Sequence, residues 1–200
     1  MAWNKYYVFV KGAGVKEVEP LLLKDLIPEK EVNLFDTNKP KTLFAGEYNG
    51  CLLIVEKDLP FEFFNAALGK RAQALLALFP EAEIGALLQN ATVGQYGYTV
   101  IKAGKRIRTK HGSEEEVYFE FGTPLEEEQE SPDEPLFEEE ELEDMREDGL
   151  SEKEIREIIR FERDFRVPGK LVKRYLGVIF NELDPTEVKL TRYERGVEEL

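Results

Sequence analysis

One segment of the sequence places basic and aromatic side chains close together. Two tyrosines, Tyr96 and Tyr98, are followed by five basic residues: Lys102, Lys105, Arg106, Arg108 and Lys110. Cations beside aromatic rings suit single-stranded nucleic acid, because they neutralise phosphates while the rings stack on bases. The candidate nucleic-acid contacts are therefore Tyr98, Arg106, Arg108 and Lys110.

Expected strand pairing weakens that interpretation. If residues 111–113 form a three-residue hairpin loop, Lys110 faces Glu114 and Arg108 faces Glu116. One face of the hairpin then carries a ladder of opposite charges, and phosphates would have to compete with the adjacent glutamates. We expect this structural role, with His111 as a surface loop residue. Nucleic-acid binding through the Tyr96–Lys110 hairpin is kept as an alternative.

The second chemically notable group is a concentration of carboxylates. Residues 114–148 contain eighteen acidic residues against one base, Arg146, so this window is −17 in a chain of −14 and the rest sums to +3. Two carboxylates can act as an acid and base pair in glycoside hydrolysis. Abundance says nothing about placement, however, and no nucleophile, base and orienting group can be named together. A carboxylate-based hydrolase is therefore an alternative without named catalytic residues.

A solvated acidic surface is the more usual meaning of such a run of charge. Our leading hypothesis is a non-enzymatic binding or regulatory protein with an acidic surface for a basic protein partner. The candidate partner-binding residues combine charge with apolar anchors: Phe137, Glu138, Glu139, Glu140, Glu141 and Leu142. The sequence does not predict the oligomeric state.

Familiar cofactor and metal motifs are incomplete. Gly12-Ala13-Gly14 follows a strand, but Glu17 stands where a dinucleotide-binding loop has its third glycine. A calcium loop over residues 144–155 fails because Ile155 replaces the bidentate carboxylate. With a single cysteine, Cys51, and a single histidine, no ordinary zinc site is available. We therefore predict no cofactor and no metal.

The composition suits one folded domain over residues 1–200. The chain is 42% hydrophobic, which is enough for one core. Its apolar runs are too short for a signal peptide or a membrane span. We expect a cytoplasmic protein without a membrane partner.

Strand patterns dominate the first two thirds of the chain. Asn49-Gly50 predicts a two-residue hairpin between 42–48 and 51–56, with Phe44 facing Val55. Further strands are expected at 6–11, 96–102, 105–110 and 115–121, and also at 84–90, where a helix is the alternative. The apolar spacing of 60–79 predicts a helix, either continuous or broken at Gly69. Residues 15–26 fit either a short helix or an irregular segment.

The last third is expected to be more polar and then helical. Residues 123–150 have the composition of an acidic flexible insert. Ser151 and Glu154 form a capping box at the start of a helix to about Phe165, which Pro168 should stop. Residues 169–177 suggest a further short helix, and 178–180 and 188–193 suggest small strands. Residues 151–200 should form a C-terminal helical extension that packs on the same core.

Several of these turns and strands occur together in a recognisable order. The run from Ala91 to Tyr98, the turn Ala103-Gly104, and the sequence from Phe121 to Leu125 follow the hairpin Gly46–Gly50. This arrangement, over about residues 40–128, resembles a bacterial family of uncharacterised domains. The resemblance implies an α+β fold and brings no catalytic residue with it.

The expected fold class is α+β. A mostly antiparallel sheet is covered by two or three helices, chiefly 60–79 and 151–166, and a long acidic loop leaves one edge.

Overall fold

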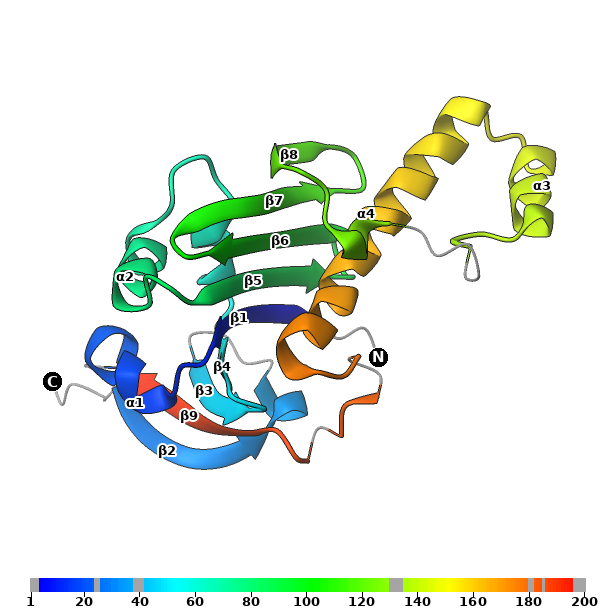
Figure 1. Cartoon of the computed structure of the whole chain (residues 1–200). Coiled ribbons are helices and arrows are strands. Elements are labelled where there is room, and N and C mark those ends of the chain that lie inside the picture. The colour runs from blue at the N-terminus through cyan, green and yellow to red at the C-terminus, as the bar shows by residue number, and fades with distance from the viewer. Residues whose placement is uncertain are drawn as a thin grey trace, which may run out of the picture.

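The protein folds around one antiparallel sheet of nine strands (Figure 1). The computed structural model describes residues 4–23, 26–37, 42–129, 135–179, 182–184 and 186–195. The strand order is β2-β9-β3-β4-β1-β5-β6-β7-β8. The strands are β1 (Lys5–Lys11), β2 (Leu26–Asn33), β3 (Leu43–Tyr48), β4 (Cys51–Val55), β5 (Glu83–Asn90), β6 (Gln95–Lys102), β7 (Lys105–Ser113), β8 (Val117–Gly122) and β9 (Lys189–Arg195). The predicted α+β class with an antiparallel sheet is confirmed.

The central strands are buried on both faces. In β1, Tyr7 and Phe9 point to one face, while Val8 and Val10 point to the other. Strands that are apolar on both faces need a layer of structure on each side. Helix α4 (Glu152–Leu176) lies on the first face and packs across β1, β5 and β6. It contributes Val167, Leu171, Val172, Tyr175 and Leu176 to the core.

The opposite face is covered by shorter elements. These are a 3-10 helix (Pro60–Phe63), α2 (Lys70–Leu78) and α1 (Val15–Val18), which continues as a π-helix over Glu19–Leu23. The expected 60–79 helix is therefore divided, and the backbone at Gly69 is extended at the start of α2. The side chains of Phe63 and Phe64 fill the space that a continuous helix would have covered.

The hairpin expected at Asn49-Gly50 is confirmed. Phe44 pairs with Val55 and Tyr48 with Cys51, and Asn49 has a positive φ of 49°. The Asn49 side chain also donates a hydrogen bond of 2.7 Å to the carbonyl of Leu176. The turn thereby caps the carboxyl end of α4, where a helix has orphan carbonyls.

Helix α4 starts as expected but ends later. The Glu154 N–H donates to the Ser151 hydroxyl at 3.3 Å, which confirms the capping box. Pro168 does not stop the helix, because buried residues on both sides of it pack on the sheet. Residues 169–177 belong to the same helix, which ends in the left-handed conformation of Gly177. Val178 and Ile179 are not in a strand, and Phe180 lies outside the described residues.

The acidic region contains helices where a flexible loop was expected. A 3-10 helix spans Glu126–Glu128, and α3 spans Glu139–Glu147. Figure 1 shows α3 beside the first turns of α4, on a projection that stands away from the sheet. We call residues 136–150 the acidic arm. Within the described part of the chain, no helix is both long and apolar enough to cross a membrane.

Candidate functional site

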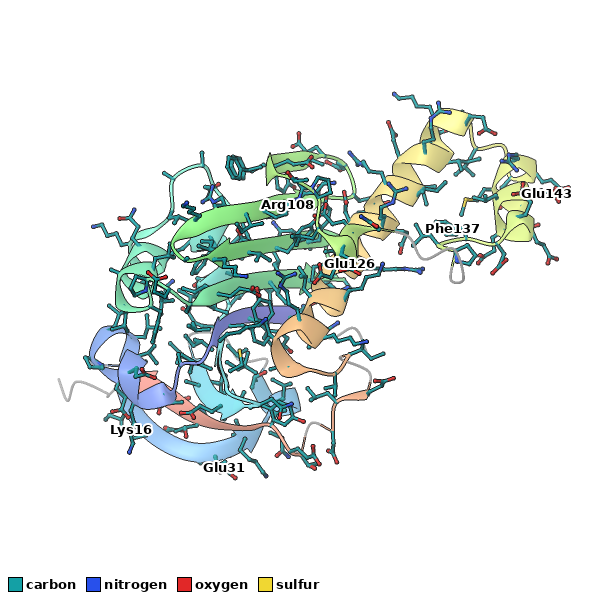
Figure 2. All side chains as sticks on the ribbon, viewed as in Figure 1. Lys16, Glu31, Arg108, Glu126, Phe137 and Glu143 are labelled. Atoms are coloured by element: carbon teal, nitrogen blue, oxygen red, sulfur yellow. The ribbon has the colours of Figure 1, made fainter. Side chains whose placement is uncertain are left out.

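The acidic arm separates its apolar and charged side chains. Phe137, Leu142, Met145 and Leu150 are half-buried, whereas the carboxylates are exposed. Figure 2 shows Phe137 on the arm between α3 and α4, and Glu143 on the side of α3 that faces away from α4. The arm therefore presents its charge outward.

Eight acidic residues lie between 138 and 148, with Arg146 as the one base. Arg146 pairs with Glu139 at 3.4 Å and with Glu152 at 3.0 Å. The other seven acids of this stretch have no ion-pair partner among the residues that the structure describes. The predicted partner-binding residues Glu138–Glu141 are all exposed, at the N-cap and in the first turn of α3.

The acids nearer the sheet are placed differently. Arg108 of β7 is 1% exposed and pairs with Val100, whose side chain belongs to the same core as those of α4. Its guanidinium donates to Glu128 at 2.8 and 2.6 Å and to Glu120 at 2.6 Å. Burial lowers the pKa of Arg108, but these hydrogen bonds outweigh burial and raise it. For Glu128, burial raises the pKa, and the bonds from Arg108 and from the Leu125 N–H bring the net shift below its usual value.

A second buried pair extends this polar layer. Lys110 contacts Asp164 of α4 at 2.7 Å, and the Tyr96 hydroxyl donates to the same carboxylate at 3.0 Å. Asp164 is 3% exposed. A charge that is buried so deeply needs a partner, so Lys110 and Asp164 join β7 to α4.

Glu127 forms a further ion pair between the acidic residues that follow β8 and helix α4. Arg174 of α4 donates to Glu127 at 3.0 Å and to Glu83 at 2.8 Å. Hydrogen bonds to Glu83 raise the pKa of Arg174. Glu120, Glu127 and Glu128 therefore neutralise arginines of the body, and we call these three residues the paired acids.

The charge ladder expected between β7 and β8 is wrong. Strand β7 continues through Ser113, so Lys110 pairs with Glu120 and Arg108 with Gly122. The hairpin turn lies later than residues 111–113, and the register differs by six residues from the expected one. A bulge at Ile107 also places Arg106 and Arg108 on opposite faces.

The structure does not bring the four proposed nucleic-acid contacts to one surface. Tyr98 is fully buried, and burial raises its pKa. Arg108 is paired with Glu120 and Glu128, and Lys110 is paired with Asp164 of α4. Arg106 lies on the opposite face, over the rings of Phe119 and Phe121 at 5.6 and 5.9 Å.

Arg106 is part of a shallow hollow of about 450 Å³ beside β8. Its guanidinium donates to the carbonyl of Ala66 at 3.3 Å. The hollow is bordered by Ala66, Leu68, Arg106, Phe119 and Phe121. No sequence motif marked this site, although the aromatic run in β8 was visible.

His111 is buried rather than being a surface loop residue. Its ring lies 5.1 Å from Phe64 and 5.1 Å from Tyr118, between ring centroids. Burial lowers the pKa of His111 to about 4. The imidazole is therefore neutral at pH 7 and serves as a packing residue.

The partly buried carboxylates do not converge on one apolar pocket. Glu56 has a raised pKa because of burial, but it also accepts from Arg71 at 2.7 Å. It borders a hollow of about 310 Å³ whose lining also includes Tyr6 and Asn90. Among the described residues, no three His, Cys, Asp or Glu side chains are grouped to hold a metal ion.

The resemblance of about residues 40–128 to a bacterial family stays a prediction, since no family model, curated protein or solved structure matches this chain.

Proposed function

We propose that this chain is a non-enzymatic binding or regulatory protein of the bacterial cytoplasm, and that its acidic arm docks a basic protein partner. One observation carries the proposal. The chain contains two kinds of acidic residue. Those of the arm are exposed and, apart from Glu139 beside Arg146, have no ion-pair partner among the described residues, whereas the paired acids are held by arginines.

The electrostatics of the arm support attraction of a basic surface. Carboxylates that share one small projection add their potentials and increase the rate at which an oppositely charged protein associates. Glu138–Glu141 are exposed, so a partner can reach their carboxylates directly. The half-buried Phe137 and Leu142 supply apolar surface nearby.

The proposal is tested by changing charge without changing the fold. The test variant carries Glu138→Gln, Glu139→Gln, Glu140→Gln and Glu141→Gln. The paired acids remain in place in this variant, so the ion pairs of Arg108 and Arg174 are unchanged. The matched control carries Glu19→Gln, Glu29→Gln, Glu31→Gln and Glu81→Gln, which removes the same charge from exposed sites outside the arm.

The measurement is affinity capture from a bacterial lysate at 50 and 150 mM salt, with identification by mass spectrometry. The wild type and the control variant should retain the same basic protein, and the arm variant should lose it. Retention should fall with salt, because exposed charges are screened over roughly 10 Å at 0.1 M. Equal retention of that protein by the arm variant would reject the docking role.

A further inference from the structure

Strand β8 forms one end of the sheet. Among the described strands it pairs with β7 alone, and Figure 1 shows it at the top of the sheet. The carbonyls of Phe121 and Gly122 accept hydrogen bonds from the Arg108 guanidinium. The backbone groups of Val117–Glu120 that face away from β7 are therefore the ones that a new strand would meet. An edge with unpaired N–H and C=O groups is a template for another strand.

The two ends of the sheet differ in how they are protected. At the other end, β2 contains Pro28 and shifts register between Pro28 and Glu31. Its residues 29–31 are all charged and exposed. Both end strands contain one register shift, so the difference between them lies in the proline and in the run of charged residues, which protect an edge against further pairing.

Strand β8 has neither proline nor lysine. Its Tyr118 and Phe121 are 50% and 48% exposed. The pairing shifts at Tyr118 and is regular from Phe119 onward.

The hollow beside β8 suits the side chains of an added strand. It is lined by Phe119 and Phe121 of β8, by Ala66 and Leu68, and by Arg106, whose guanidinium lies over the two rings and donates to the carbonyl of Ala66. Because side chains alternate between the faces of a strand, every second residue of a new strand would reach this hollow. The intermediate residues would lie on the face of Glu120, whose side chain is 46% exposed.

The charged residues that flank β8 indicate what kind of chain would pair with this strand. Exposed Glu114, Glu115 and Glu116 immediately precede β8, and exposed Glu126 follows it. A second copy of this chain would bring the same acids opposite one another, which is unfavourable. A basic segment would complement them.

We infer that the free edge of β8 binds an extended segment of a basic protein, with apolar residues at alternate positions seated in the hollow. Main-chain hydrogen bonds would supply affinity, and the hollow would supply selectivity. The basic character of the occupant rests on the proposed function, but the edge and the hollow are separate from the arm.

The test uses three labelled nine-residue peptides in fluorescence anisotropy with the full chain. The first alternates lysine and valine. The second has the same composition with the valines grouped together. The third is the alternating peptide with N-methyl groups on alternate backbone nitrogens, which removes donors needed by a sheet.

The alternating peptide should bind at least about tenfold more tightly than either of the others, which corresponds to about 1.4 kcal/mol. The substitution Phe121→Thr should remove this preference, whereas Ile27→Thr on the exposed face of β2 should retain it. Equal binding of all three peptides, or an unchanged preference in Phe121→Thr, would overturn the inference. So would self-association through β8 in sedimentation experiments.

The two proposals fail in different ways. Loss of the arm charges should weaken the binding of all three peptides by a similar factor and leave the order of their affinities unchanged. If the order is absent but the arm variant still weakens binding, the edge inference fails and the docking role survives. If the order is present and the arm variant has no effect, the reverse holds.

Discussion

The paired acids and the arm acids belong to one continuous acidic window, but their environments are opposite. Glu128 has a side chain that is 9% exposed and is held by Arg108, while Glu139 is 74% exposed and shares Arg146 with Glu152. A carboxylate among buried cations is needed for folding, whereas one in water contributes little to stability. Charge density along a sequence therefore does not distinguish a structural acid from one free to bind.

The largest difference in stability between the two regions should come from replacing the arginine of each. Arg108→Met leaves buried Glu128 without its main partner and should lower the free energy of unfolding by about 4 kcal/mol. Arg146→Met, in the arm, should change it by less than about 0.5 kcal/mol. Urea unfolding of both variants at pH 7.5 measures the difference, and equal effects would contradict the contrast.

The carboxylates themselves give the next contrast. Glu128→Gln removes the charge that holds two Arg108 nitrogens, and we expect a loss of about 2 to 3 kcal/mol. Glu140→Gln is the matched change in the arm and should be within about 0.5 kcal/mol of wild type. Thermal and urea unfolding should rank the variants in that order; a costly Glu140→Gln would show that the arm acids are structural.

Lowering the pH should reduce the stability of the protein through His111, which belongs neither to the paired acids nor to the arm. The folded His111 has a pKa of about 4, below the unfolded value of about 6.5. The unfolded state therefore takes up a proton first as the pH falls from 6.5 to 4. The resulting loss of stability is about 2 kcal/mol at pH 5.

The variant His111→Gln isolates that contribution. Between pH 7.5 and 5 its unfolding free energy should fall by about 2 kcal/mol less than that of the wild type. The paired acid Glu128 has a lowered pKa, so its contribution is present above its unfolded pKa and is lost only at lower pH. Identical pH profiles for variant and wild type would show that His111 is not buried as a neutral ring.

The smallest expected effect concerns the base of the arm. Ser151→Ala removes the hydroxyl that caps α4 and should lower the free energy of local opening at the start of this helix by about 1 kcal/mol. Because the first turn of α4 is exposed, amide exchange should quicken there while the global unfolding midpoint changes little. A matched fall in global stability would place this turn in the cooperative core.

Local sequence signals predicted the elements well where the chemistry is local. Asn49-Gly50 favours the backbone of a tight hairpin, and Ser151 with Glu154 favours a helix start; both are present. Pro168 wrongly predicted the end of a helix, because the free-energy cost of a proline inside α4 is outweighed by the packing of this helix on the sheet. His111 misled because Gly112 beside it suggested a turn, whereas the ring packs on Phe64.

The placement of the acids could not be predicted from the sequence. Arg108 and Glu128 are 20 residues apart, and Arg174 and Glu127 are 47 apart. No periodicity relates such pairs, since only the folded sheet and α4 bring them together. The exposed character of Glu138–Glu141 was expected, but the helix that carries them was not.

The most direct test is carboxyl footprinting of the full chain, alone and in complex with the basic protein retained in the capture experiment. In the free chain, carbodiimide labelling should modify Glu138–Glu141 readily and Glu127 and Glu128 poorly. In the complex, labelling of Glu138–Glu141 should fall while the labelling of Glu19 and Glu29 stays constant. Unchanged labelling of Glu138–Glu141 on complex formation would contradict the assignment of the acidic arm as the docking surface.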